Sequence, residues 1–440
     1  MKYYSTNGKA PIADLHKAVV KGLAEDRGLY MPEKINKLPK EFFDNIEKMS
    51  FQEIAYTVAS AFFGEDVDPD ALHDIVYDTL QFDCPVVNVK DNIYTLELFH
   101  GPTLAFKDVG ARFMARLLQY FIKQENNHKE VNVLVATSGD TGSAVANGFL
   151  GVDGIHVYVL YPKGKVSPIQ ECQFTTLGKN ITAIEVDGVF DDCQALVKNA
   201  FMDAELNEHM KLTSANSINV ARFLPQAFYY FNAYARMKEK ANTQHLSPNT
   251  QLVMCVPSGN FGNICAALFG HEMGLPIKRF IAANNANDIF YNYLQTGKYE
   301  PKPSKQTLAN AMDVGDPSNF ARIYDLYGKS HAKITSLISG ATYSDEQIKA
   351  TMRECYKDSG YILDPHGACG YQALKDGLQA GEVGVFCETA HPAKFKEKVD
   401  DILGIDVEIP ECLAAFMRGQ KQSVPMSKDF ANFKDYLMRQ

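Results

Sequence analysis

The stretch LELFHGPTLAFKDVGARFMARLLQYF, residues 96–121, predicts a strand, a turn and a helix in succession. We expect the strand to end at Phe99 and the helix to follow Asp108, so that Lys107 lies beside the strand's carboxyl end. Ligand sites in open α/β sheets lie at such ends, and apolar neighbours would partly desolvate this lysine and make its amine a nucleophile. A solvated lysine at a helix start has the same local pattern, so the other segments must decide.

Short apolar runs alternate with longer amphipathic stretches through most of the chain after residue 85. This alternation predicts an α/β fold with parallel sheets covered on both faces. Residues 1–90 instead have helical periodicity, clearest at 51–63 and 71–82, and predict a helical N-terminal domain. The expected strands are NIYTLELF (92–99), VNVLVAT (131–137), IHVYVLY (155–161), ITAIEV (181–186), QLVMCV (251–256), RFIAAN (279–284) and VGVFCE (383–388).

Two further strand ends are followed by loops that suit an anion. VLVATSGDTGSAVANGFL (133–150) places Ser138, Asp140 and Thr141 before a helix, where N–H groups and hydroxyls favour a carboxylate over a phosphate because Asp140 is acidic. A helix cap with turn glycines explains this segment equally well when it stands alone. QLVMCVPSGNFGNICAALFG (251–270) has two glycines that let its backbone enclose a phosphate at the positive end of a helix. The alternative interpretation of this second segment is an ordinary strand–helix turn that binds no ligand.

The residues of this second loop are Ser258, Gly259, Asn260, Phe261, Gly262 and Asn263. Neither a Walker loop nor a G-x-G-x-x-G after a strand occurs, so nucleotide binding has little support. One amine nucleophile and two anion-accepting loops suit a small cofactor with one aldehyde and one phosphate. Pyridoxal phosphate is such a molecule.

Three other stretches are rich in polar groups. Ser214 to Arg222, SANSINVAR, suits a second phosphate or carboxylate, with a helix cap and a surface arginine as an equally good interpretation. Asp364-Pro365-His366-Gly367 and Glu388-Thr389-Ala390-His391-Pro392 each precede a helix, and either histidine could simply be a capped, satisfied one. Thr389 is a candidate partner for the ring nitrogen because it follows a predicted strand end.

Composition excludes several classes of protein. A chain of 440 residues predicts two or three domains, and no apolar run reaches membrane-spanning length. The net charge of −9 argues against nucleic-acid binding. The nine cysteines have neither C-x-x-C nor metal-ligand spacing, so we expect free thiols, no metal site and a cytoplasmic protein without a secretory signal.

Motifs along nearly the whole chain resemble threonine synthase, a fold-type-II pyridoxal-phosphate enzyme similar to the tryptophan synthase β-chain. The central ones are HGPTLAFKD (100–108), ATSGDTG (136–142) and PSGNFGN (257–263). YYSTNG (3–8), GLAEDRGLYMPE (22–33), SANSINVARFLPQ (214–226), AMDVGDPSNFAR (311–322) and TAHPAKF (389–395) extend the resemblance to both ends. It implies two parallel-sheet domains, a large one at 91–112 and 217–440 and a small one at 113–216, after an N-terminal domain at 1–90.

The resemblance also implies roles for individual residues. Lys107 would form the Schiff base with the cofactor and then act as general base and acid, and Thr389 would hydrogen-bond the pyridine nitrogen. Residues 258–263 would hold the cofactor phosphate, and Ser138, Asp140 and Thr141 would surround the substrate carboxylate. The substrate phosphate would bind to Asn216, Ser217, Asn219 and Arg222.

The implied reaction converts O-phospho-L-homoserine and water to L-threonine and phosphate, the last step of threonine biosynthesis, in a monomer or homodimer. Protons would leave Cα and then Cβ before the γ-phosphate departs. Protonation at Cγ would then make Cβ electrophilic, water would add at Cβ, and Cα would be reprotonated. One alternative is a pyridoxal-phosphate-dependent serine or threonine dehydratase, whose substrate lacks phosphate. Another is a non-catalytic synthase-like protein that binds phosphorylated amino acids, although such a binder needs no amine like that of Lys107.

Overall fold

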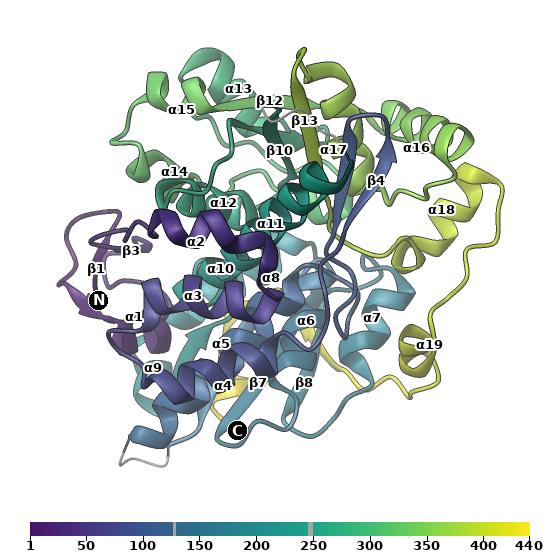
Figure 1. Ribbon diagram of the computed structural model, residues 1–440. Helices are drawn as coiled ribbons and strands as arrows, with labels where there is room; N and C mark the ends of the chain where they lie inside the picture. Colours follow the sequence, from purple (N-terminus) through teal and green to yellow (C-terminus); the bar gives the residue numbers. More distant parts are fainter. Residues whose placement is uncertain (126–128, 245–249) are drawn as a thin grey trace. The chain divides into compact units, whose positions relative to one another are not determined.

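The chain builds two large, mostly parallel sheets, each in its own compact unit (Figure 1). The computed structural model describes residues 1–125, 129–244 and 250–440. Unit 1 contains Met1 and residues 31–106 and 223–408, and unit 2 contains residues 2–30, 107–222 and 409–440. Among the described residues, no helix combines the length and the apolar character that a membrane span requires.

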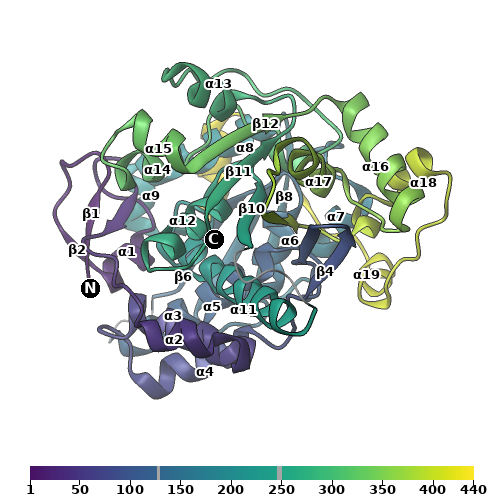
Figure 2. The same ribbon diagram turned by 45° about the horizontal axis from the view of Figure 1, so that its top comes forward.

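Unit 1 is organised around a six-stranded sheet with the strand order β12-β11-β10-β13-β5-β4. All neighbouring pairs are parallel except β4 and β5, which are antiparallel. Its central strands β10 and β13 are buried almost throughout, as expected for strands covered on both faces. Figure 2 shows β12, β11 and β10 side by side. The strands are β4 (Val86–Lys90), β5 (Ile93–Glu97), β10 (Gln251–Pro257), β11 (Arg279–Asn284), β12 (Ile338–Thr342) and β13 (Glu382–Glu388).

Helices cover this sheet, and α17 packs on β10, β11 and β13. The predicted helix at 51–63 is α3, which begins with a capping box between Ser50 and Glu53. The prediction at 71–82 corresponds to α4, which begins after Asp68 and ends at Thr79. The helices of unit 1 are α2 (Lys40–Asn45), α3 (Phe51–Phe63), α4 (Pro69–Thr79), α11 (Ala227–Gln244), α12 (Gly262–Glu272), α13 (Ile289–Thr296), α14 (Phe320–Leu326), α15 (His331–Leu337), α16 (Asp345–Ser359), α17 (Pro365–Gly377) and α18 (Lys396–Leu403), with short 3₁₀ turns η1 (Ile46–Lys48), η2 (Leu224–Gln226), η3 (Asn310–Met312) and η4 (Pro392–Phe395).

Unit 2 contains a five-stranded parallel sheet with the order β14-β8-β7-β6-β9. Its strands are β6 (Val131–Ala136), β7 (Ile155–Pro162), β8 (Ile181–Asp187), β9 (Lys211–Ser214) and β14 (Val424–Ser427). Its helices are α1 (Leu15–Lys21), α5 (Lys107–Gln124), α6 (Asp140–Phe149), α7 (Pro168–Thr175), α8 (Phe190–Met202), α9 (Ala204–His209), α19 (Glu411–Met417) and α20 (Phe430–Leu437). Two short strands, β1 (Lys2–Ser5) and β2 (Ala13–Asp14), pair antiparallel, while β3 (Tyr30–Pro32) and α10 (Val220–Phe223) span the points where the chain passes between units.

The seven predicted strands all occur, so the prediction of an α/β fold with two parallel sheets is confirmed. The carboxyl-terminal strand β14 differs from the expected arrangement, because it pairs with β8 at the edge of the unit 2 sheet. Residues 424–427 therefore do not belong to the sheet of the predicted large domain at 217–440. A separate domain at 1–90, and the other predicted boundaries, stay predictions.

Candidate active site

The loop after strand β10 has a run of backbone N–H groups without an acceptor among the residues that the structure describes. It connects Pro257 to α12, and Phe261 has a left-handed backbone with φ of 64°. Within residues 1–125, 129–244 and 250–440, no protein acceptor receives a hydrogen bond from the N–H groups of residues 259–263. Successive N–H groups before a helix start attract an anion, and the helix dipole adds to the attraction. This loop has the donors that a phosphate group needs.

The side chains of Ser258 and Asn263 shape this loop from within. The Ser258 hydroxyl donates to Oδ1 of Asn263 over 2.9 Å, and Nδ2 of Asn263 donates to the Pro257 carbonyl over 2.8 Å. The same Oδ1 accepts the N–H of Ile264. Both side chains are thus engaged with the protein, and their direct contact with a ligand stays a prediction.

Two other segments of unit 1 fix the loop from outside. The Asn260 carbonyl accepts both the backbone N–H and the side-chain amide of Asn319, each over 3.1 Å. Gly259 lies so close to Ala311 that a Cβ added to the glycine would stand 2.5 Å from the Ala311 carbonyl oxygen. Only a residue without a side chain fits there, so the loop is a cradle whose width depends on Ala311.

The segment before Lys107 is tied to the segment around Thr389. The Phe106 N–H donates to the Thr389 carbonyl over 2.8 Å, and the His391 N–H donates to the Leu104 carbonyl over 3.0 Å. Nζ of the buried Lys394 donates to the Thr103 carbonyl over 2.9 Å. Since Lys107 directly follows Phe106, these bonds fix the start of the chain segment that carries it.

The structure thus brings together two segments that the sequence analysis named separately. One is the segment after β13 that contains Thr389, and the other is the turn before Lys107. Lys394 was missed. Its only signal was a lysine in the apolar run Ala-Lys-Phe at 393–395.

Lys107 is the first residue of α5, two residues earlier than the helix start predicted after Asp108. In its own unit, the Lys107 carbonyl accepts Nη1 of Arg222 over 3.3 Å, and Nε of Arg222 donates to the Ala215 carbonyl over 2.6 Å. Gly110 permits this approach, because a Cβ there would stand 2.3 Å from the Arg222 carbonyl oxygen. The buried Arg222 therefore supports the start of α5, and a direct contact with substrate phosphate stays a prediction.

The other polar residues of the 214–222 segment divide into two groups. The amide of Asn219 is buried and donates to the carbonyls of Val19 and Ser214, while its oxygen accepts the Ala221 N–H. Asn216 and Ser217 are half-buried. Nδ2 of Asn216 donates over 3.2 Å to the Ala136 carbonyl at the end of β6, so this segment lies beside the start of the 138–142 loop. Substrate binding by Asn216, Ser217 and Asn219 stays a prediction.

The 138–142 loop precedes α6. Oγ1 of Thr137 accepts the N–H groups of Gly139 and Gly142, and Oδ1 of the buried Asp140 accepts Nε2 of Gln170 over 2.9 Å. Ser138 and Thr141 are half-buried. The Asp140 carboxylate thus helps to hold the loop, and the two hydroxyls are the side chains more accessible to a ligand. Their predicted contact with a substrate carboxylate is untested.

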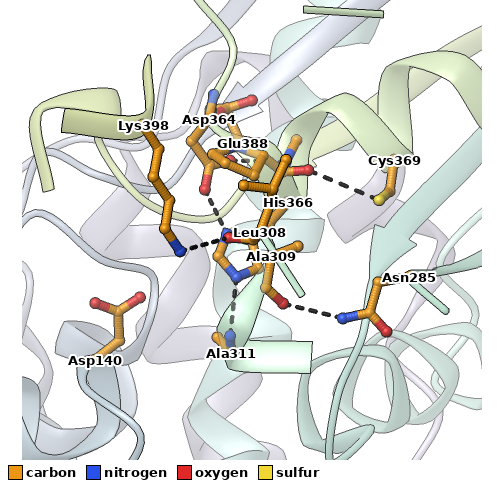
Figure 3. Close-up of polar contacts among 12 residues, drawn as sticks. Asp140, Asn285, Leu308, Ala309, Ala311, Asp364, His366, Cys369, Glu388 and Lys398 are labelled. Atoms are coloured by element: carbon orange, nitrogen blue, oxygen red, sulfur yellow. Dashed lines mark hydrogen bonds and ion pairs between the residues drawn. The ribbon is translucent and has the colours of Figure 1, made fainter. Parts of the chain in front are cut away.

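Two buried acids meet at the end of β13, Glu388 as the last residue of the strand and Asp364 beside it (Figure 3). Oε1 of Glu388 accepts the Asp364 N–H over 2.8 Å, and Oδ2 of Asp364 lies 2.5 Å from Nδ1 of His366. Burial and the neighbouring Asp364 carboxylate raise the pKa of Glu388 well above its ordinary value. Burial alone would also raise the pKa of Asp364, but His366 beside it holds that pKa below its usual range. Glu388 is therefore the protonated acid of this pair and Asp364 the ionised one.

Both histidines that the sequence singled out have fixed partners in unit 1. Nδ1 of His391 accepts the Ala393 N–H over 3.0 Å and caps η4, and burial followed by the nearby His100 lowers the pKa of His391 to about 4. Nε2 of His366 accepts the Ala311 N–H over 3.1 Å. Both histidines are thus hydrogen-bonded to protein groups, as the structural interpretation of each predicted.

The raised pKa of Glu388 predicts a pH-dependent effect of E388Q on stability. Above about pH 4 the unfolded chain releases this proton while the folded protein keeps it, so this group lowers the free energy of unfolding as pH rises. Glutamine has no such proton. We expect E388Q to gain stability relative to the original chain between pH 5 and pH 8, by about 1 kcal/mol or more, measured by urea unfolding at both pH values.

Glu382 provides the matched control at the other end of β13. Its hydrogen bond with Arg279 lowers its pKa to about 2, even though burial opposes the shift, so E382Q should lose stability near neutral pH. A difference between E388Q and the original chain that is the same at pH 5 and pH 8 would contradict a protonated Glu388.

Three family models match this chain. A model described as pyridoxal-phosphate dependent enzyme matches residues 82–387. Models described as threonine synthase N terminus and threonine synthase, C-terminal, match residues 2–80 and 367–437. Together they extend over almost the whole chain.

Known relatives are similar over the same length. The threonine synthase of Serratia marcescens is 43% identical over 438 residues, which cover 100% of this chain and 99% of that protein. The crystal structure of threonine synthase from Escherichia coli matches with a TM-score of 0.92 and 43% identity over 100% of both chains. A crystal structure titled PLP bound threonine synthase from Brucella melitensis matches with a TM-score of 0.91 and 34% identity, covering 100% of this chain and 99% of that one.

Proposed function

This chain belongs to the threonine synthase family, and from that premise we propose that the 258–263 loop, Lys107 and Thr389 form its cofactor site. The protein is a threonine synthase, a pyridoxal-phosphate-dependent lyase. The observation that carries the proposed site is the run of N–H groups at residues 259–263, at the start of α12, that have no acceptor in the described part of the chain.

We propose O-phospho-L-homoserine as the substrate, and L-threonine and phosphate as the products, of a carbon–oxygen lyase reaction with water. Two further parts of the proposal concern the whole protein. All nine cysteines are free within the described residues, which fits the reducing cytoplasm in which we place it. The protein would act as a monomer or homodimer.

The proposed cofactor site matches the chemistry of the group it would hold. The N–H groups of residues 259–263 would bind the phosphate, and the close approach of Ala311 to Gly259 would define the size of that cradle. Thr389 directly follows the buried strand β13, and its neutral hydroxyl would hydrogen-bond the pyridine nitrogen. When bound, pyridoxal phosphate supplies an aldehyde for covalent attachment and an electron sink for carbanions.

Lys107 would supply the amine that bonds covalently and the group that carries protons at the substrate carbons. Its position at the first residue of α5 favours this role, because the positive end of a helix dipole disfavours a second positive charge and thus favours the neutral, nucleophilic amine. The Arg222 bond to the Lys107 carbonyl would fix the backbone from which this side chain extends. Lys107 would remove the Cα proton and return it after water has added.

The substrate's two anionic groups require separate binding sites. The hydroxyls of Ser138 and Thr141 would bind the carboxylate, on a loop that Asp140 and Gln170 hold in shape. Four residues of the 214–222 segment would bind the phosphate, namely Asn216, Ser217, Asn219 and Arg222. The bonds of Asn219 and Arg222 to backbone carbonyls would also hold that segment in place. The bond from Asn216 to Ala136 supports this arrangement, because it joins the two segments within unit 2.

The purified protein with pyridoxal phosphate tests the proposed substrate. We expect O-phospho-L-homoserine to yield inorganic phosphate and L-threonine in equal amounts, and neither L-serine nor L-threonine to yield ammonia at a comparable rate. Ammonia from serine or threonine without turnover of phosphohomoserine would support a dehydratase. Saturable binding of phosphohomoserine without any product would support a non-catalytic binder.

A further inference from the structure

A short turn in unit 1 presses against the loop proposed to hold the cofactor phosphate. We call residues 309–312, which include η3, the 309–312 turn. A Cβ added at Gly259 would stand 2.5 Å from the Ala311 carbonyl oxygen and 3.1 Å from Cα of Met312. The backbone of Gly259 therefore cannot move toward this turn, and any shift of the turn changes the space open to the loop.

His366 holds the 309–312 turn at its centre (Figure 3). Nε2 of His366 accepts the N–H of Ala311 over 3.1 Å. A ring nitrogen that accepts a hydrogen bond carries no proton, so the neutral ring has its proton on Nδ1. Nδ1 lies 2.5 Å from Oδ2 of Asp364 and donates to it, which fixes both the tautomer and the ring plane.

Asp364 is itself anchored on both sides. Its Oδ1 accepts the Gly367 N–H over 2.7 Å and caps α17, and its own N–H donates to Oε1 of Glu388 at the end of β13. Asp364 and His366 are both buried, and hydrogen bonds in such an interior are stronger and costlier to lose than bonds at the surface. Hydrogen bonds thus connect the end of β13 to the 258–263 loop. They lead from Glu388 through Asp364 and His366 to Ala311, which lies against Gly259.

We propose that His366 is a positioning residue for the cofactor phosphate, acting through Ala311 on the conformation of Gly259 and its neighbours. This inference rests on the proposed role of the 258–263 loop. His366 uses both ring nitrogens for protein contacts, so it has no nitrogen left for substrate or cofactor. Its effect on the cofactor should therefore depend on the cofactor's phosphate and not on its ring.

Substitution of His366 by asparagine or by glutamine tests the roles of the two ring nitrogens separately. Asparagine places an amide group near the position of Nδ1 and leaves the Ala311 N–H without an acceptor, whereas glutamine places an amide oxygen near the position of Nε2. Affinity is measured on the cofactor-free protein by titration with pyridoxal phosphate and, separately, with pyridoxal, which lacks the phosphate.

We expect H366N to weaken pyridoxal phosphate binding on the order of tenfold to a hundredfold, because a buried donor loses its acceptor. Pyridoxal binding should change less than about twofold, because pyridoxal has no phosphate for the 258–263 loop to hold. H366Q should recover most of the loss. Equal losses for both ligands, or an H366Q no better than H366N, would overturn the proposal, because a merely structural histidine gives no such selectivity.

The affinities of the original chain for the two ligands distinguish a failure of the phosphate role of the 258–263 loop from a failure of the positioning role of His366. If the original chain binds pyridoxal as tightly as pyridoxal phosphate, the phosphate role of the 258–263 loop fails. If it prefers pyridoxal phosphate and H366N keeps that preference, only the positioning role of His366 fails. Should both His366 variants fail to fold, A311P removes the N–H donor and leaves the His366–Asp364 pair in place; it must then show the same selective loss, and unchanged selectivity contradicts the proposal.

Discussion

K107A should lose turnover of O-phospho-L-homoserine on the order of 10⁴-fold or more, while the protein stays folded and still binds pyridoxal phosphate. The amine of Lys107 has two proposed tasks, covalent attachment and proton transfer at the substrate carbons, and each contributes a large factor to the rate. Alanine fits the first position of α5 and leaves the Lys107 carbonyl available to Arg222. The rate is measured as phosphate release, and cofactor binding by the visible absorbance and by equilibrium dialysis.

K123A is the matched control, since Lys123 lies in the last turn of the same helix and is exposed. It should keep both the rate and the absorbance of the lysine-bound cofactor. A K107A protein that retains that absorbance, or loses less than about tenfold in rate, would show that another amine does the work.

G259A should impair cofactor binding and lower stability together. Its new Cβ would stand 2.5 Å from the Ala311 carbonyl oxygen, which is backbone and cannot rotate away. Overpacking of this kind costs about 1–3 kcal/mol of folding free energy. The loop can relieve the clash only by moving its N–H groups, and a misplacement of about 1 Å can lower the rate on the order of 100-fold.

The measurements for G259A are urea unfolding, pyridoxal phosphate affinity and phosphate release. G377A serves as the control, because a Cβ at Gly377 meets only the flexible end of Ile281, at 3.2 Å, and alanine favours the helix α17. If G259A binds the cofactor as tightly as G377A does, the 258–263 loop does not hold the phosphate.

Local sequence was sufficient to predict the secondary structure around the three segments of the proposed site. Apolar runs at 131–137 and 251–256 became β6 and β10, and the glycine-containing loops after them lead into α6 and α12 as expected. These features depend on hydrophobic periodicity and turn chemistry, which act over a few residues. The same patterns predicted that each loop lies at the carboxyl end of a strand in a parallel sheet.

Contacts between distant segments could not be predicted in this way. Lys394 and Thr103 are 291 positions apart, and no local pattern indicates that a lysine at one will bind a carbonyl at the other. The pairing of β14 with β8 is another case, because its four residues are too short to show periodicity.

The buried side chains of the 214–222 segment show a different limit. The sequence indicates that Asn219 and Arg222 can donate hydrogen bonds, but burial decides whether the acceptor is a ligand or a backbone carbonyl. Arginine is usually exposed, so the sequence left an anion ligand and a surface arginine as equally good interpretations and did not indicate the buried contacts that Arg222 makes.

The most direct test of the central claim is to identify the lysine that bonds to the cofactor. The protein is loaded with pyridoxal phosphate, reduced with borohydride to make the bond permanent, digested, and mapped by mass spectrometry. We expect the modified lysine to be Lys107, on the peptide that contains Phe106 and Asp108. Modification of Lys394, the fully buried lysine that binds the Thr103 carbonyl, or of any other lysine in its place, would contradict the account.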